Sequence, residues 1–206
     1  GLKTLYVKDD TVNPTYSFKD RPVSVAVSKA VEFDAKAVGC ASTGNSAASM
    51  AAHAAKAGLP CYVFVPADIE LNKIVQASTY GATIIAVKGT FDDANRLAVQ
   101  ALEDYDWSFA NINIRPYYVE GSKTLAFEVC EQLGWETPDH VIVPVGTGAL
   151  LCAIWRGFKE FKQLNLIDDA QIKVTGAQPS GCSPVVNAFK ANTLDIDPIK
   201  CLNTIA

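Results

Sequence analysis

Short apolar segments alternate with helical segments along most of this chain. The apolar segments that read as strands are 37–41, 61–66, 83–88, 108–111, 140–145 and 172–178. Segments with helical periodicity lie between or beside them, and several end at a glycine: 45–57, 70–80, 91–105, 121–133 and 149–162. Because parallel strands need helical connections that cover both faces of their sheet, this order predicts an α/β fold of open, mainly parallel βαβ domains.

The domain boundaries are predicted from the order of these elements, because no repeat or low-complexity linker divides the chain. Residues 35–119 contain a self-sufficient series of strands and helices, which predicts a small βαβ domain. Residues 1–34 and 120–206 must then find partners elsewhere, and we expect them to form parts of one larger, discontinuous domain. The chain starts without methionine and ends without a helix stop signal, so we expect a fragment of a longer protein.

Composition excludes several classes of partner. The formal net charge is −4 and the pI is near 5.2, and no basic run is interleaved with aromatic residues. This pattern argues against binding to nucleic acid or to an anionic membrane. The sequence contains no signal peptide and no apolar run of membrane-spanning length. We therefore expect a globular protein that binds small molecules.

The cysteines and histidines do not indicate a metal site. The six cysteines are isolated, with no Cys-x-x-Cys pair and no histidine at ligand spacing, so neither a zinc site nor a disulfide framework is expected. Cys40, Cys61 and Cys152 lie in segments that we expect to be buried, which predicts reduced thiols in a cytoplasmic protein. His53 and His140 are far apart and read as structural or surface residues.

One lysine stands where a predicted strand gives way to a helix. Residues 2–8 alternate as a strand does, and residues 21–31 read as a helix with Pro22 in its first turn. Lys19 therefore lies near a helix N-terminus, where the positive end of the peptide dipoles disfavours an ammonium ion. Its free amine would be available to attack a carbonyl group. The alternative is a solvated surface lysine, which is the commoner role.

A hydroxyl-rich turn joins the strand at 37–41 to the helix at 45–57. The turn and the helix start contain Ser42, Thr43, Asn45 and Ser46. Backbone N–H groups and hydroxyl groups would converge there on an anion. Ordinary capping of the helix is the alternative, although four polar residues exceed what one cap needs.

A glycine-rich turn follows the strand at 140–145. Gly146 and Gly148 would allow the backbone to approach a phosphate group closely, and the helix that follows favours negative charge. A dinucleotide fingerprint is the alternative, but Leu151 replaces its third glycine, and Asp168 and Asp169 precede their strand rather than end it.

Together the three turns predict a site for a phosphorylated aldehyde. All of them lie at carboxyl ends of strands, where open α/β sheets bind ligands. Pyridoxal phosphate, held as an imine by Lys19, accounts for the amine, the anion site and the phosphate loop.

The same residues resemble a known enzyme family. Residues 13–21, Asn-Pro-Thr-Tyr-Ser-Phe-Lys-Asp-Arg, are similar to the lysine motif of the threonine synthase family. That family belongs to the pyridoxal-phosphate enzymes with the tryptophan synthase β-subunit fold, called fold type II. Residues 41–49 resemble its substrate loop, 120–124 a helix start in the same enzymes, and 146–150 the loop for the cofactor phosphate. The resemblance spans nearly the whole chain and implies two domains with the cofactor in the cleft between them.

The resemblance implies a role for each turn. Lys19 would form the internal aldimine with pyridoxal 5′-phosphate and move protons, and Asn45 would hydrogen-bond the O3′ atom of the cofactor ring. The residues expected around the cofactor phosphate are Gly146, Thr147, Gly148, Ala149 and Leu150. Those expected to bind the substrate are Ser42, Thr43, Gly44 and Ser46 at its carboxylate and Arg115 at its phosphate.

The implied reaction converts O-phospho-L-homoserine and water into L-threonine and phosphate. The implied enzyme is a cytoplasmic, homodimeric lyase of threonine biosynthesis. Asp20, beside Lys19, is more typical of threonine synthases than of dehydratases, whereas Tyr16 stands where many relatives have glycine. The residue that contacts the pyridine nitrogen would lie beyond Ala206.

Two alternatives remain open. A threonine or serine dehydratase, or a cysteine synthase, would share the lysine and the phosphate loop. A fragment that binds the cofactor or a partner without turnover is an alternative from another class. Release of phosphate from O-phosphohomoserine would identify a threonine synthase. An imine absorbance band without turnover would identify a fragment that only binds the cofactor.

Overall fold

The computed structural model describes residues 3–168 and 171–197, and the chain divides into two compact units, Gly1–Ser122 and Lys123–Ala206. The elements of the first unit are α1 Asp20–Glu32, β1 Ala37–Ala41, α2 Asn45–Ala57, β2 Cys61–Pro66, α3 Asn72–Thr79, β3 Thr83–Val87, α4 Phe91–Asp104, β4 Trp107–Phe109 and α5 Arg115–Gly121. Those of the second unit are α6 Thr124–Gln132, β5 His140–Pro144, α7 Ala149–Gln163, β6 Lys173–Ala177 and α8 Pro184–Lys190.

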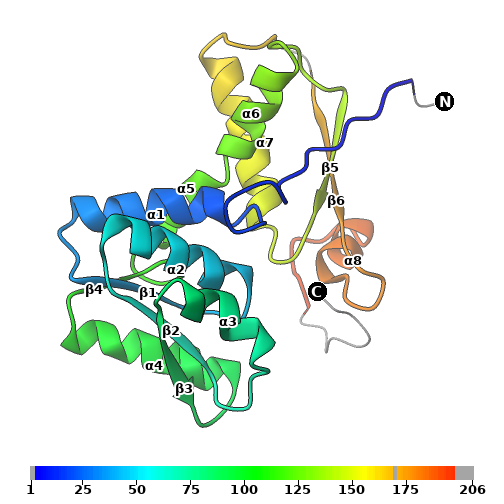
Figure 1. Ribbon diagram of the computed structural model, residues 1–206. Helices are drawn as coiled ribbons and strands as arrows, with labels where there is room; N and C mark the ends of the chain where they lie inside the picture. Colours follow the sequence, from blue (N-terminus) through cyan, green and yellow to red (C-terminus); the bar gives the residue numbers. More distant parts are fainter. Residues whose placement is uncertain (1–2, 169–170, 198–206) are drawn as a thin grey trace. The chain divides into compact units, whose positions relative to one another are not determined.

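The first unit is built on a parallel four-stranded sheet in the order β3-β2-β1-β4 (Figure 1). Within it β1 is an inner strand, with Val38 opposite Cys61 of β2 on one side and Ser108 of β4 on the other. The chain passes from β1 to β2 on one side, whereas β4 joins on the opposite side. The carboxyl end of β1 is therefore a topological switch point, which is where open α/β sheets bind ligands.

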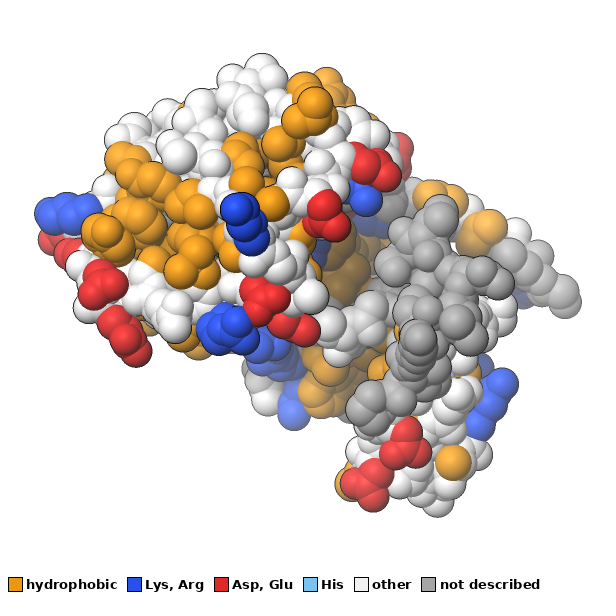
Figure 2. All heavy atoms as spheres, turned by 90° about the horizontal axis from the view of Figure 1, so that it is seen from below, with side chains coloured by type: hydrophobic (Ala, Val, Ile, Leu, Met, Phe, Trp, Pro, Cys, Tyr) orange, Lys and Arg blue, Asp and Glu red, His pale blue; other side chains and the backbone are white. Residues whose placement is uncertain are grey.

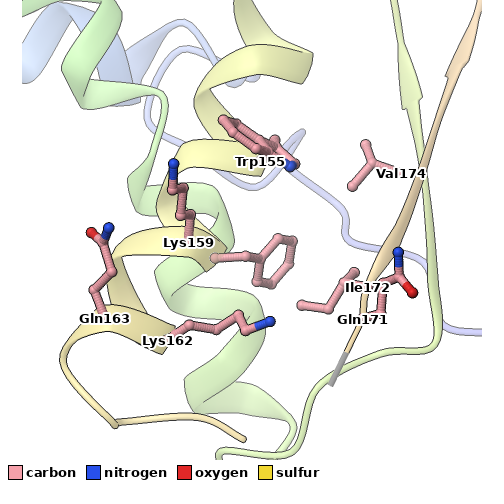
Figure 3. A pocket seen from close by; sticks show the side chains of 8 residues that line it. Trp155, Lys159, Lys162, Gln163, Gln171, Ile172 and Val174 are labelled. Atoms are coloured by element: carbon pink, nitrogen blue, oxygen red, sulfur yellow. The ribbon is translucent and has the colours of Figure 1, made fainter. Parts of the chain in front are cut away.

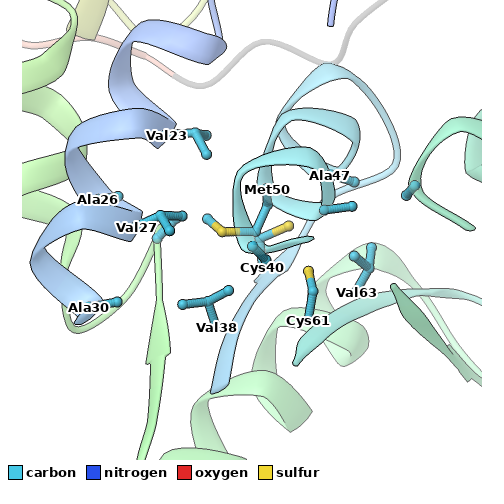
Figure 4. Close-up of a cluster of buried hydrophobic side chains, with 14 of the residues drawn as sticks. Val23, Ala26, Val27, Ala30, Val38, Cys40, Ala47, Met50, Cys61 and Val63 are labelled. Atoms are coloured by element: carbon cyan, nitrogen blue, oxygen red, sulfur yellow. The ribbon is translucent and has the colours of Figure 1, made fainter. Parts of the chain in front are cut away.

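Two hydrophobic cores cover the two faces of this sheet. On one face, α1 and α2 pack on β1 and β2, while α3 packs beside α2 and β3, and the buried residues include Val23, Val27, Val38, Met50 and Val63 (Figure 4). The other face is covered by α4, whose Ala94 and Ala98 lie in one cluster with Phe64 and Phe109. Alanine is frequent on the buried side of α2, and its small side chain lets this helix approach the sheet and α1 closely.

Helix α5 contacts the beginning of α1 at a glycine, Gly121. A Cβ atom on Gly121 would lie 2.6 Å from Pro22 Cα and would also collide with the carbonyl group of Arg21. Only glycine permits this approach, so the end of α5 rests directly on the first turn of α1. At the other end of α1, the rings of Phe33 and Tyr117 meet edge to face at 5.5 Å.

The second unit pairs β5 with β6 in parallel, with Val141 opposite Val174. Helices α6 and α7 provide its core, in which Ala126, Ile154 and Phe158 are buried together with Val143 of β5. An ion pair of 2.5 Å between Lys123 and Glu160 joins the beginning of α6 to α7.

The structure confirms the parallel α/β fold class and most of the predicted elements. The bounds of β1, α2 and β2 agree with the prediction residue by residue, and Gly58, Gly81 and Gly134 have the positive φ expected at helix ends. The predicted opening strand is wrong: residues 3–10 form no strand. Leu5, Tyr6 and Val7 are exposed, so this alternating segment has no described neighbour to pair with.

Two short helices were not predicted. The segment expected as one helix at 121–133 instead begins at Thr124, and a separate helix, α5, precedes it. Both α5 and α8 have seven residues and a proline in the first turn. Such short segments carry too little helical periodicity to be identified from that pattern alone.

Every helix among the described residues is too short or too polar to span a membrane. On the face shown in Figure 2, hydrophobic side chains gather beside Lys, Arg, Asp and Glu. Exposed large apolar residues include Phe91, Leu97 and Val99 of α4.

Candidate active site

Lys19 occupies the N-cap position of α1, as the sequence predicts. Its side chain is half-buried, and its amine lies 4.7 Å from the centroid of the Phe18 ring and 5.8 Å from that of Tyr118. Its backbone N–H donates to Ser17 Oγ at 3.3 Å. The amine is thus held beside two aromatic rings at a helix start, which is a different setting from that of a solvated surface lysine.

The residue after the lysine, Asp20, is a buried carboxylate. Its Oδ2 accepts the Thr15 N–H at 2.7 Å, and its Oδ1 accepts the Thr15 hydroxyl at 2.7 Å. Oδ1 also accepts the hydroxyl of Ser49, on α2, at 2.6 Å. The carboxylate therefore fastens the turn that carries Lys19 to α2. The sequence identified Asp20 only as a family marker; a Thr five residues earlier, able to close a turn, was the available signal.

A second carboxylate holds the other end of the same turn. Arg21 donates from Nε to Asp10 Oδ2 at 2.7 Å and from Nη2 to Asp10 Oδ1 at 2.8 Å. Only about a tenth of each side chain is exposed, at 10% and 12%. This two-pronged geometry is specific and strong, so residues 10–21 are fixed at both ends.

The hydroxyl-rich turn at 42–46 does not serve to cap α2. The N-cap residue of α2 is Gly44, and no side chain of the described residues caps this helix. Ser42 Oγ accepts only the Gly44 N–H, at 3.4 Å. By contrast, Thr90 and Asp93 form a complete capping box on α4. The interpretation of the turn as an ordinary cap is therefore wrong, and the start of α2 suits an anion.

Tyr118 of α5 connects this turn to the lysine. Its hydroxyl lies 3.2 Å from Ser46 Oγ, while its ring is the one that lies near the Lys19 amine. Tyr118 is not among the residues predicted from the sequence, because the sequence predicts no helix at 115–121. Pro116, near the beginning of α5, was the signal that could have placed a helix there.

Two of the remaining predicted residues in the first unit stand at the beginning of helices. Asn45 and Arg115 are the first residues of α2 and α5, and both are exposed. Thr43, like Ser42, is half-buried. The structure thus brings Lys19 and Ser46 together through Tyr118, while the role expected of Arg115 stays a prediction.

The predicted phosphate loop, residues 146–150, lies in the second unit. Gly148 is the N-cap of the 15-residue helix α7 and has a φ of 87°, a conformation that favours glycine. No described side chain caps α7, and Cβ atoms at Gly146 or Gly148 would have nothing within 4 Å. An uncapped helix start with open space around its glycines fits a phosphate group. Its approach to Lys19 stays a prediction from the sequence.

Burial makes the inner cysteines poor nucleophiles. It raises the pKa of Cys61 to about 12 and also raises the pKa of Cys40 and Cys130. Cys152 is exposed, so its predicted burial is wrong. It belongs to an apolar run on α7, and a helix cannot turn every residue of such a run toward one core. Cys201 lies outside the described residues, and the five described cysteines are free thiols.

The described residues also bear on two other kinds of site, a metal centre and a pocket. They contain no group of His, Cys, Asp or Glu that could hold a metal ion. A hollow of about 440 Å³ in the second unit lies between α7 and β6, lined among others by Trp155, Phe158, Lys159, Ile172 and Val174 (Figure 3). It contains none of the predicted site residues.

Comparison with known proteins finds chains of similar sequence and similar fold. A family model described as "Pyridoxal-phosphate dependent enzyme" matches residues 1–206. The chain is 48% identical to a threonine synthase of Methanocaldococcus jannaschii and 42% identical to one of Methanosarcina acetivorans. Each match covers 100% of this chain and 51% of the relative, so the chain spans about half the length of these curated relatives.

Solved structures show the same fold. Serine racemase from Dictyostelium discoideum matches with a TM-score of 0.75 and 26% identity, over 90% of this chain and 58% of that one. Threonine deaminase isoform 2 from Solanum lycopersicum matches with a TM-score of 0.75 and 21% identity, over 93% and 52%.

Proposed function

This chain belongs to the family of pyridoxal-phosphate-dependent enzymes, and we propose that it carries the lysine and the substrate loop of a threonine synthase. The proposed reaction converts O-phospho-L-homoserine and water into L-threonine and phosphate. The relatives named threonine synthase support this choice over a dehydratase, and so does Asp20 beside Lys19.

The residues that would hold the cofactor lie at three helix starts. Lys19 would bind its aldehyde carbon, Asn45 its ring oxygen, and residues 146–150 its phosphate group. When bound, pyridoxal phosphate withdraws electrons from the carbon atoms of the attached amino acid. The Lys19 amine, once released, would take a proton from the substrate carbon and return it later in the reaction.

The 42–46 turn would orient the substrate. Its hydroxyl groups and the uncapped amides of α2 suit a carboxylate, which would fix the amino acid relative to Lys19. Arg115 would contact the substrate phosphate, because a guanidinium group matches phosphate oxygens in pairs.

The main support for the proposal is that Tyr118 adjoins both Lys19 and Ser46. The Lys19 amine lies near its ring, and Ser46 lies at its hydroxyl, so the nucleophile and the substrate turn adjoin one side chain. Reacting groups held in one place lower the barrier to reaction by fixing orientation in advance.

The test uses the complete gene product that contains this chain. Supplied with pyridoxal phosphate and O-phosphohomoserine, it should release L-threonine and phosphate in equal amounts, and K19A should abolish both. A 2-oxo acid formed from threonine or serine would instead identify a dehydratase. An imine absorbance band without any product would identify a binding fragment.

Two further parts of the proposal rest on the resemblance to the family: we infer a homodimer and a cytoplasmic location. The larger domain expected to combine residues 1–34 with 120–206 rests on the order of the elements and stays a prediction; helix α1 packs within the first unit. Sedimentation velocity of the complete gene product at several concentrations tests the dimer. A species of one subunit's mass at all concentrations would contradict it.

A further inference from the structure

The carboxylate of Asp20 has more hydrogen bonds than its place in α1 requires. It is 4% exposed, and three donors from two segments converge on it: the N–H and hydroxyl of Thr15 and the hydroxyl of Ser49. Burying a carboxylate is costly unless such bonds compensate, and apolar residues of similar volume are often as stabilising in its place. A buried carboxylate at this position therefore points to a need for directional contacts.

The position of Ser49 shows what those contacts control. Residues four apart lie on the same face of a helix, so Asn45, Ser49 and His53 form one row along α2. Asp20 is bonded to the middle of this row, and His53 Nδ1 lies 3.7 Å from its Oδ1. His53 Nδ1 also lies 2.9 Å from the Ser49 carbonyl oxygen, which fixes the imidazole against the same turn.

Asp20 therefore stands between two parts of the candidate site. Lys19 precedes it directly, and Asn45 begins the row that it contacts. Rotation or sliding of α2 would break the bond to Ser49 and would also move Ser46, which contacts Tyr118 beside the Lys19 amine. Directional bonds to a charged acceptor resist such motion.

We propose that Asp20 is a positioning residue, whose carboxylate holds the Lys19 turn and the first turns of α2 in one register through Thr15 and Ser49. This inference rests on the proposed function, because it assumes that Lys19 and the start of α2 act on one ligand. Asp20 does not touch the ligand itself. It acts through the two segments that it joins.

The chain offers a matched control in Asp93. That carboxylate also accepts both the N–H and the hydroxyl of a threonine, Thr90, but it does so at the start of α4, on the opposite face of the sheet. D20N and D93N each replace a carboxylate bonded to a threonine. Only D20N disturbs the link between α1 and α2.

The experiment measures how fast pyridoxal phosphate becomes attached to Lys19 in the complete gene product, by borohydride trapping at timed intervals. Melting temperature is recorded for every variant. We expect D20N to slow attachment by about tenfold or more, the loss expected for a hydrogen bond to a charged group, and D93N to leave the rate unchanged. S49A should slow it as well. T15V should do the same, and T15S should recover most of the loss.

The outcomes separate this inference from the proposed function. If the wild-type protein is not labelled at Lys19, the proposed function fails. If Lys19 is labelled normally in wild type, D20N, S49A and T15V alike, while only the melting temperatures fall, Asp20 has a structural role alone and the inference is overturned. Should D20N fail to fold, the labelling rates of S49A and T15V test the inference in its place.

Discussion

The hydroxyl groups of Tyr118 and Ser46 lie 3.2 Å apart, although 72 residues separate them in the sequence. The contact joins α5 to the first turn of α2, beside the Lys19 amine. It gives Ser46 a fixed orientation toward whatever binds at the start of α2, because a paired hydroxyl has fewer directions open to it.

Removal of the Tyr118 hydroxyl should weaken substrate binding selectively. We expect Y118F to raise the KM for O-phosphohomoserine about 3- to 10-fold, the effect of one neutral hydrogen bond, with little change in kcat. Y117F is the control, because Tyr117 lies on the same helix but packs on Phe33. Steady-state kinetics of the complete gene product provide the measurement. An unchanged KM in Y118F, or an equal rise in Y117F, would remove Tyr118 from the site.

The glycine between α5 and α1 should not tolerate a side chain. In G121A the added Cβ would meet the backbone of Arg21 and Pro22, so we expect a loss of about 1–3 kcal/mol in the free energy of unfolding. G146A is the control, since a Cβ there would meet nothing within 4 Å. Denaturant unfolding of the cofactor-free protein measures both. Equal stability of G121A and wild type would show that the two helices can separate at little cost.

Stability should fall in alkaline solution, partly through Cys61. Burial raises the pKa of this thiol from 9.0 to about 12 in the folded protein. Below pH 9 both folded and unfolded states keep the proton; between about 9 and 12 only the unfolded state loses it. The free energy of unfolding should therefore decrease as pH rises through this window, by about 1.4 kcal/mol per pH unit for one thiol.

The C61A variant isolates this contribution. Its free energy of unfolding, measured in urea from pH 8 to 12, should decline less steeply than that of wild type by the share of one thiol. Only the difference in slope matters, because C61A also removes packing atoms from the core. Parallel pH profiles for the two proteins would contradict the expectation.

Local sequence signals were sufficient for the elements that make up the first-unit sheet and its central helix. The apolar run of β1 predicts both ends of that strand. The alanine-rich periodicity of α2, together with Gly58, predicts both ends of that helix. The opening segment shows the limit of such signals. Its alternating residues predict a strand, but a strand needs a neighbour, and Leu5 and Tyr6 are exposed.

The candidate site was predictable where one turn carries the chemistry and not where distant segments meet. The 42–46 turn follows from a strand-to-helix junction, whereas Lys19 follows from the helix start alone, because no strand forms at residues 3–10. Asp20 and Tyr118 are important because they contact α2. Their hydrogen bonds to Ser49 and Ser46 span 29 and 72 residues, and no local pattern predicts a hydrogen bond over such separations. The strand order that places β1 beside β4 is likewise a long-range property.

Chemical trapping shows whether Lys19 is the residue that binds pyridoxal phosphate. The complete gene product is incubated with pyridoxal phosphate, reduced with borohydride and digested, and the labelled peptide is identified by mass spectrometry. K29A serves as the control, because Lys29 lies on the same helix but is paired with Glu32. We expect a label on Lys19 in wild type and in K29A. A label on another lysine, or no label on wild-type protein that is folded, would contradict it.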